Sequence, residues 1–399
     1  MERDFRAKSP YNAVHLILPK PDGLKIPSEV EGDSWTPYEQ VRERLSGWLH
    51  NRIIQPDSTP AIYVYRIAYR EDGKEKENLG FFALGKLEEY LSPGVAPHEN
   101  ILTSPREDRL KLRLSTQADF GPVYMVYSDA EKVFERLTAP VLSSPPLITA
   151  RDMAGELHQL WAITDEATIR QAAYLLASKP TLIADGHHRY DAALESYRRN
   201  PDNPWFAHRL MAFFNAEGGG LSVRPIHRLL LPFEFSSREL LERLSVSFEV
   251  KLVYTGAFDN PTFQKDFSGA SSRLDENVEG RHRFRLLLNG SMYRVSCPKT
   301  TNLDVAVLEQ AVFREALALT DERLKDLLAY STSAFEAAVR VEQGKALAGF
   351  LLDPPTIEDI WRVVQSGGKL PPKSTFFYPK LLTGLLMNIN FKFYNQNNG

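Results

Sequence analysis

The sequence of 399 residues contains a single cysteine, Cys297. One thiol excludes an internal disulfide and any zinc or iron–sulfur site built from several cysteines, and this composition fits a reducing compartment best. Neither sign of charge is in excess, because 48 Lys and Arg residues face 51 Asp and Glu residues, for a net charge of −3. The chain therefore lacks the broad basic surface on which non-specific nucleic-acid binding depends, and nucleic acid is not an expected partner.

Long hydrophobic runs are also missing. No segment approaches the roughly 18 apolar residues that a membrane span needs, and the start Met1-Glu2-Arg3-Asp4-Phe5-Arg6 lacks the apolar stretch of a signal peptide. We therefore expect a cytoplasmic protein without a membrane partner. The 43% hydrophobic and 25% charged residues are typical of a globular chain, and the length suggests two or three domains.

Periodic segments predict a chain of mixed helices and strands. Residues 13–18 are expected to form the first strand, and residues 36–49 an amphipathic helix. Strands at 61–69 and 79–84 are expected to be joined through a tight turn at Glu71-Asp72-Gly73. The other segments expected to be regular are strands at 122–127, 181–184, 209–215, 222–230, 284–288, 293–297 and 346–352, and helices at 166–177, 190–199, 237–244, 305–317 and 357–365.

The change from paired strands to helical periodicity near Leu231-Pro232 predicts a domain boundary. The fold class expected is α+β, with a mixed-sheet domain over residues 1–230 and a second α+β region over residues 231–399. Gly218-Gly219-Gly220, between two expected strands, is interpreted as a hairpin turn rather than as a phosphate cradle.

The sharpest chemical signal is Asp185-Gly186-His187-His188-Arg189, which follows a short apolar strand and precedes a helix. Gly186 permits a close backbone approach, and the first amides of a helix can bind an anion. Arg189 adds a bidentate fork, and His187 and His188 add donors. Asp185 would lie at the rim of this phosphate site, where it could bind Mg²⁺ or accept a proton from an attacking hydroxyl. The alternative interpretation is an N-capping aspartate followed by surface histidines.

A second cluster is Pro97-His98-Glu99-Asn100, followed by the charged residues 105–109. His98 and Glu99 form a potential acid–base pair, and Arg109 could bind an anion. The alternative is a charged surface loop. His98-Glu99 is not the start of a zinc motif, because no second histidine follows at the helical spacing.

A third candidate is the aromatic run near the C-terminus that Lys373, Ser374 and Thr375 precede and Lys380 ends. These four side chains could contact phosphate, or they could belong to a basic loop. An intact P-loop is excluded, because Pro372 stands where that motif requires a glycine.

Two further positions are singled out. Pro225-Ile226-His227-Arg228 interrupts an expected strand, so His227 and Arg228 are candidates to face a ligand. Cys297 lies in an expected strand without a neighbouring histidine, which favours a buried structural thiol over a nucleophile.

The chain resembles the domain of unknown function 1015 family almost from end to end. The stretches that carry the resemblance are Trp35-Thr36-Pro37-Tyr38, Pro97-His98-Glu99, residues 183–190, Pro225-Ile226-His227-Arg228 and residues 372–380. The Gly-His-His-Arg core is also similar to the phosphate loop of the ParB/sulfiredoxin superfamily, which includes free-serine kinases. Some members of the 1015 family are pyrophosphate-dependent serine kinases. The resemblance therefore implies a ParB/sulfiredoxin-like core and phosphoryl transfer to L-serine. Sulfiredoxin has cysteine where this chain has His187, so repair of sulfinic acid is not expected.

Relatives usually begin with a further segment before the equivalent of Ser9-Pro10-Tyr11-Asn12, and this chain begins almost at that point. A strand or a substrate contact of the family is therefore expected to be missing. If 13–18 is a strand, it would lie at an open sheet edge.

The function expected is a Mg²⁺-dependent small-molecule kinase that uses pyrophosphate or a nucleotide to phosphorylate L-serine. Asp185 is the favoured catalytic base, with Glu99 as the other candidate. The alternatives are a ParB-like regulatory or nucleic-acid-binding module and a hydrolase of pyrophosphate or phosphate esters that uses the same anion site. The contacts expected are Gly186, His187, His188, Arg189, Lys373, Ser374, Thr375 and Lys380 to phosphate, and His98, Arg109, His227 and Arg228 to the substrate.

Overall fold

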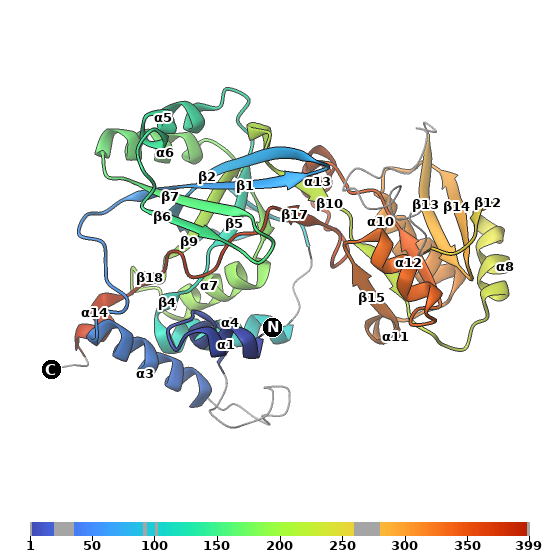
Figure 1. Cartoon of the computed structure of the whole chain (residues 1–399), viewed down its shortest axis with the longest axis horizontal. Helices are drawn as coiled ribbons and strands as arrows, with labels where there is room; N and C mark the ends of the chain where they lie inside the picture. The colour runs from blue at the N-terminus through green and yellow to red at the C-terminus, as the bar shows by residue number, and fades with distance from the viewer. Residues whose placement is uncertain (1, 20–35, 91–93, 100–102, 259–279, 397–399) are drawn as a thin grey trace.

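A computed structural model describes residues 2–19, 36–90, 94–99, 103–258 and 280–396 of the chain. One sheet contains eight described strands, two of its strand pairs being parallel and the others antiparallel. Its spatial order is β3 (Val95–Pro97), β8 (Thr181–Asp185), β5 (Val123–Tyr127), β9 (His208–Asn215), β2 (Lys74–Lys86), β1 (Ile62–Glu71), β7 (Leu157–Ile163) and β6 (Ile148–Arg151) (Figure 1).

The second sheet is antiparallel throughout its six described strands. Its order is β12 (Glu249–Thr255), β14 (Ser291–Pro298), β13 (Arg281–Leu288), β16 (Ala348–Leu351), β11 (His227–Leu230) and β15 (Leu328–Ser331). The segregation of helices and mixed sheets makes this an α+β fold, as the sequence predicted.

Helices accompany both sheets. Those of the first half are α1 (Glu2–Lys8), α2 (Val14–Ile17), α3 (Thr36–His50), α4 (Thr103–Thr116), α5 (Val133–Leu142), α6 (Glu166–Ala177), α7 (His187–Arg199) and the 3₁₀ turn η2 (Ala216–Gly218). Those of the second half are α8 (Ser237–Ser247), α10 (Asp304–Val307), the π-helix η3 (Leu308–Ala316), α11 (Asp321–Leu327), α12 (Ala334–Glu342), α13 (Ile357–Gln365) and α14 (Phe391–Gln396). None of these helices is long and apolar enough to cross a bilayer.

The two faces of the first sheet are covered differently. Apolar residues of α5, α6 and α7 pack against one face, with Phe134 and Tyr190 fully buried. The other face belongs to a hydrophobic core that continues into the second sheet, from Phe214 through Leu230 to Phe350. Apolar burial of this extent is the main stabilising contribution of a fold.

The C-terminal segment returns to the first half of the chain. Its strand β17 (Phe376–Tyr378) pairs with β10 (Ser222–Arg224), and β18 (Asn388–Ile389) pairs with β4 (Ala118–Asp119). Figure 1 shows this red segment running along the first sheet from β17 to α14. Strand β11 lies before the expected boundary but pairs with β16 of the second sheet. Strands β17 and β18 lie after the boundary but pair with strands of the first half. The division into 1–230 and 231–399 stays a prediction.

Local patterns predicted several elements correctly. The β1–β2 turn pairs Glu71 with Lys74, and both Asp72 and Gly73 have the positive φ of a tight hairpin turn. Helix α6 begins after Asp165, whose carboxylate accepts the N–H of Thr168 as an N-cap.

The strand expected at residues 13–18 is wrong, because Val14–Ile17 forms one helical turn. Asn12 starts this turn: its side chain accepts the N–H of Val14 at 3.0 Å and its carbonyl accepts the N–H of His15 at 3.0 Å. Leu16 packs against Trp48 of α3 rather than in a sheet. The open edge expected of this strand therefore does not exist.

The hairpin expected at Gly218-Gly219-Gly220 is also wrong, since β9 and β10 belong to different sheets. The strand expected over 222–230 is two strands that flank Pro225. Gly220 lies against β2, where a Cβ would fall 1.8 Å from the carbonyl oxygen of Glu77. The carbonyl of Gly220 accepts the hydroxyl of Tyr69 at 3.0 Å. Glycine is required here for a close approach between backbones.

We predict that Gly220→Ala lowers the free energy of unfolding by about 1–3 kcal/mol, because the methyl group must displace the backbone of β2. The matched control is Gly47→Ala in α3, where a Cβ would meet no atom within 4 Å. That change should stabilise by about 0.5–1 kcal/mol. Urea unfolding measures both, and a Gly220→Ala protein as stable as the parent would contradict the close approach.

Candidate active site

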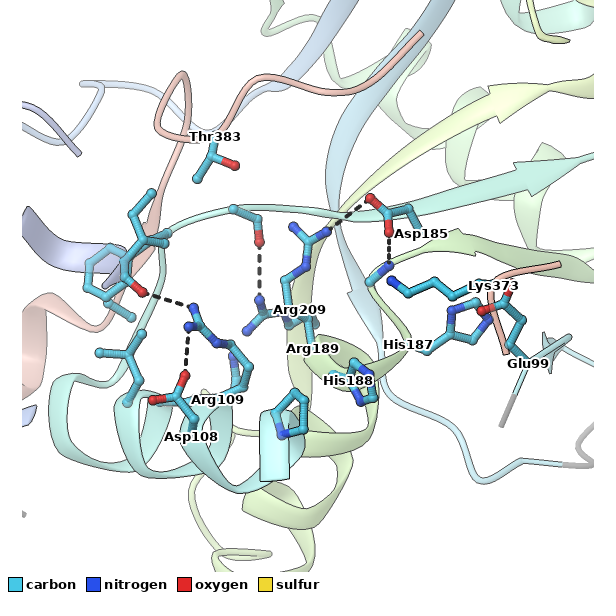
Figure 2. A pocket seen from close by; sticks show the side chains of 18 residues that line it. Glu99, Asp108, Arg109, Asp185, His187, His188, Arg189, Arg209, Lys373 and Thr383 are labelled. Atoms are coloured by element: carbon cyan, nitrogen blue, oxygen red, sulfur yellow. Dashed lines mark hydrogen bonds and ion pairs between the residues drawn. The ribbon is translucent and has the colours of Figure 1, made fainter. Parts of the chain in front are cut away.

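A cavity of about 460 Å³ opens where β8 meets α7 (Figure 2). Its walls come from α4, from the loop between β4 and β5, from the first turn of α7, and from the C-terminal segment. Five cationic side chains and three carboxylates line it: Arg109, Arg113, Arg189, Arg209, Lys373, Glu99, Asp108 and Asp185.

The turn from β8 into α7 depends on Gly186. Its φ of +94° is strained for any residue with a side chain, and an added Cβ would lie 2.9 Å from Nε of Arg189. The sequence predicted a loop at these residues and a helix from residue 190. Helix α7 instead begins at His187, so His187, His188 and Arg189 form its first turn. The first N–H groups of a helix have no partner within the helix and favour a bound anion.

Asp185 ends β8 and faces the cavity with a half-exposed carboxylate. Its Oδ1 accepts the N–H of Gly186 at 3.0 Å, and its Oδ2 lies 3.5 Å from Nη2 of Arg189 and 3.6 Å from Nζ of Lys380. Burial alone would raise the pKa of Asp185, but Lys380 and Arg189 outweigh it and hold the pKa below its ordinary value. The carboxylate is therefore ionised at neutral pH.

Three arginines of the cavity are held in place by main-chain carbonyls. Arg109 donates to Ile17 at 3.0 Å, Arg189 to Pro122 at 2.6 Å, and Arg209 to Gly121 at 3.1 Å. Burial lowers the pKa of Arg209 to about 9 although Asp119 contacts it, so the group remains charged at pH 7. Fixed guanidinium groups are well suited to bind phosphate oxygens.

The two histidines of the motif are neutral imidazoles. Burial, together with the neighbouring His98 ring, lowers the pKa of His187 to about 3. Burial also lowers the pKa of His188, and the nearby Lys373 acts in the same direction. Within the described residues, Nε2 of His187 and Nδ1 of His188 are buried without a hydrogen-bond partner. Both rings thus keep a nitrogen available for a ligand.

His98 and Glu99 bind the C-terminal segment to β8. Because a carbonyl only accepts, Nδ1 of His98 donates to the oxygen of Ile183 at 2.8 Å, while its Nε2 lies 2.6 Å from the Thr375 hydroxyl. Oε1 of Glu99 accepts the N–H of Ser374 at 3.1 Å and that of Thr375 at 3.4 Å. Burial would raise the pKa of Glu99, but the His98 side chain and the Ser374 N–H outweigh burial and bring it to about 2.

A second cavity, of about 560 Å³, adjoins the first. The two share Glu99, Asp185, His187 and Lys373 as a common wall. The second cavity is further lined by Thr375 and Lys380 and, from the β15–α12 region, by Tyr330, Ser331, Thr332 and Glu336. It therefore lies between the two halves of the fold.

Most of the candidate residues come together at these cavities, and four do not: His98, Ser374, His227 and Arg228. The hydroxyl of Ser374 is buried and donates to the carbonyl of Pro371 at 2.6 Å. His227 and Arg228 line neither cavity. Arg228 donates to the carbonyls of Ile226 and Pro372, and so supports the loop that carries Lys373.

The environment of His227 also differs from the expected ligand contact. Its Nδ1 accepts the N–H of Leu352 at 3.3 Å. Burial, with the charge of Arg228 beside it, lowers the pKa of His227 to about 4.

Sequence reasoning missed Arg113, Arg209 and Thr383. Arg113 and Arg209 each contact Asp119, which takes up part of the positive charge behind the cavity. Arg209 stands one residue before the apolar run 210–214. A charged residue next to the buried part of a strand is the signal that could have marked it.

Distant similarity to solved structures accompanies this geometry. A conserved hypothetical protein from Pyrococcus furiosus is 14% identical, with a TM-score of 0.40 over 77% of this chain and 95% of that chain. A free serine kinase in complex with AMP is 14% identical, with a TM-score of 0.39 over 76% and 96%. SbnI with a C-terminal truncation, from Staphylococcus aureus, is 11% identical, with a TM-score of 0.36 over 79% and 90%.

Among curated proteins, no sequence matches this chain. The sequence model of one family, described as a protein of unknown function (DUF1015), matches residues 1–316. The match spans Glu99, the Asp185–Arg189 motif and Arg209. The chain therefore belongs to the DUF1015 family.

Proposed function

We propose that this chain is a phosphotransferase that binds a phosphorylated donor in the cationic cavity and transfers a phosphoryl group to a hydroxyl in the second cavity. The observation that carries the proposal is the position of Asp185, an ionised carboxylate in the wall that the two cavities share. L-serine is the acceptor that the family resemblance implies, and pyrophosphate or a nucleotide is the donor.

The first cavity supports binding of a polyanion. Its arginines are already fixed by main-chain carbonyls, so little side-chain entropy is lost when a phosphate binds. The N-terminus of α7 and the available nitrogens of His187 and His188 add uncharged polar contacts. Phosphoryl transfer needs mainly such positioning and charge neutralisation.

The second cavity suits a small zwitterion. Glu336 can attract an ammonium group, although its Oε2 already accepts the hydroxyl of Ser331 at 2.6 Å. Lys373 and Lys380 can attract a carboxylate. A free amino acid with a side-chain hydroxyl carries all three groups, which is why we favour an amino acid over water as acceptor.

In this mechanism Asp185 accepts the proton of the acceptor hydroxyl while the hydroxyl oxygen forms a bond to phosphorus. The bond from phosphorus to the leaving phosphate oxygen breaks, and the arginines stabilise the charge that the leaving group gains. Glu99 is the less suitable base, since its Oε1 is already occupied by two backbone N–H groups. Asp185 and Glu99 offer the oxygen ligands that Mg²⁺ prefers, and Mg²⁺ bound there would neutralise donor charge.

We predict that Lys373→Gln weakens binding of pyrophosphate or nucleotide by about 10- to 100-fold, the effect of losing one hydrogen bond to a charged group. Calorimetric titration measures the affinity. The matched control is Lys369→Gln, four residues earlier, since Lys369 lines neither cavity. Equal affinities of the two variants would remove Lys373 from the donor site.

We predict that Asp185→Asn lowers turnover by about 10²-fold or more and leaves donor binding largely intact, because asparagine keeps the acceptor for the Gly186 N–H but cannot take a proton. Asp165→Asn is the control, because asparagine is an equally good N-cap.

The assay is a screen of pyrophosphate and nucleotides against L-serine and related hydroxyl compounds. Phosphate release that does not depend on any acceptor would favour a hydrolase. Near-normal turnover of Asp185→Asn would exclude this carboxylate as the base.

The pH dependence of stability tests the neutral state of His187. With a folded pKa of about 3 and an unfolded pKa near 6.5, the unfolded chain binds a proton that the folded chain does not. Stability from this group is complete above about pH 6.5 and is lost as the pH falls toward 3. We predict that His187→Asn flattens the decline in unfolding free energy between pH 6.5 and 4.5 by up to about 1.4 kcal/mol per pH unit. Parallel pH curves of the two proteins would contradict a buried neutral imidazole.

A further inference from the structure

Asp152, Glu156 and His158 come together where β6 turns into β7. These two strands lie at the edge of the first sheet (Figure 1). Each side chain can offer one ligand atom, and the three atoms lie within 4.8 Å of one another. None of the three residues lines either cavity of the candidate active site. The proposed phosphotransferase chemistry gives this cluster no role.

The imidazole of His158 provides the decisive observation, because it is fully buried and only one of its two nitrogens has a hydrogen-bond partner among the described residues. Its Nδ1 lies 2.6 Å from the hydroxyl of Tyr65. Its Nε2 has no hydrogen-bond partner among the described residues, and Oδ2 of Asp152 is 3.8 Å away. A buried polar atom without a partner is costly and rare, and here it faces a carboxylate.

The backbone presents the two carboxylates toward this ring. Oδ1 of Asp152 accepts the N–H groups of Ala154 and Glu156, both at 2.9 Å, which leaves Oδ2 directed to His158. Glu156 directly precedes β7 and His158 is the second residue of that strand; both are buried, whereas Leu157 between them is partly exposed. Glu156 is only 6% exposed. The Asp152 side chain is 23% exposed. Two carboxylates held this close repel each other, and a proton or a bound cation relieves that repulsion.

We propose that Asp152, Glu156 and His158 bind a divalent transition-metal ion, with Zn²⁺ and Mn²⁺ as the chemical class. Two carboxylate oxygens and one imidazole nitrogen are a mixed donor set that such ions accept, whereas Mg²⁺ prefers oxygen alone. Ligands at tetrahedral zinc are about 3.4 Å apart. The His158 nitrogen and the Asp152 oxygen, now 3.8 Å apart, need to close by a few tenths of an ångström, and no pair of the three ligand atoms exceeds 4.8 Å. Three protein ligands leave a position for water.

Tyr65 completes the site as a support for the histidine. Binding through Nε2 requires the ring proton on Nδ1, from where it is donated to the Tyr65 oxygen; metal-bound histidines usually donate this N–H to an oxygen. The same tyrosine oxygen accepts the N–H of Leu382 at 3.3 Å. Leu382 lies between Lys380 and Thr383, which line the cavities. The metal would thus stabilise the segment that delivers Lys380 to Asp185.

The test uses the full chain without an affinity tag, freed of metal by chelator and dialysis. Zn²⁺ and Mn²⁺ are titrated separately by calorimetry, with Mg²⁺ for comparison, and Co²⁺ absorption reports coordination by nitrogen. We expect one tight equivalent of Zn²⁺ per chain and a rise in melting temperature. Glu156→Gln and Asp152→Asn should each weaken binding at least about 10-fold, and asparagine keeps the Oδ1 acceptor of the turn.

Two further variants locate the site. Glu166→Gln removes an equal charge from an exposed position of α6 and should bind like the parent. Asp185→Asn should also retain the tight equivalent, since Asp185 belongs to the other site. The proposal is overturned if the parent chain shows no saturable Zn²⁺ binding, if both cluster variants bind as the parent does, or if Asp185→Asn alone abolishes the tight equivalent.

Discussion

The carboxylate of Glu99, which is only 18% exposed, joins two parts of the chain that are more than 270 residues apart. A carboxylate taken out of water is costly unless hydrogen bonds satisfy it, and here the N–H groups of Ser374 and Thr375 do so. His98 makes the same connection through Ile183 of β8 and the Thr375 hydroxyl. The loop that carries Lys373 cannot leave this position without exposing both buried groups. The lysines of the C-terminal segment are therefore fixed beside Asp185.

The cationic cavity is stable because its four arginines are paired with carboxylates before a ligand arrives. The arginine side chains donate to main-chain carbonyls, and Asp119 contacts both Arg113 and Arg209. These partners hold like charges close together at the expense of some electrostatic repulsion. The remaining positive charge favours an anion, and the rigid arrangement means that little reorganisation accompanies its binding. Stability and ligand preference thus arise from the same contacts.

The parts of this structure that depend on neighbouring residues could be predicted from the sequence. The Glu71–Lys74 turn, helix α6 and the strand–glycine–helix transition at Gly186 have local causes. Residues 13–18 were mistaken for a strand, since alternation along six residues does not reveal the Asn12 side chain that starts a helical turn. Arg209 and the docking of Ser374 on Glu99 depend on contacts between distant segments, and no local pattern encodes these.

The two halves of the fold contribute different residues to the walls of the two cavities. The arginines that line the cationic cavity lie within residues 1–316, the part that the family model matches. Lys373, Lys380 and the β15–α12 residues that line the second cavity lie beyond it. One hydrophobic core packs the two sheets together, so these walls cannot separate freely. Under the proposed function, the arginines at phosphate come from the first half and Lys373 is added from the second. The choice of acceptor would be set by side chains such as Glu336, which can vary without disturbing the arginines.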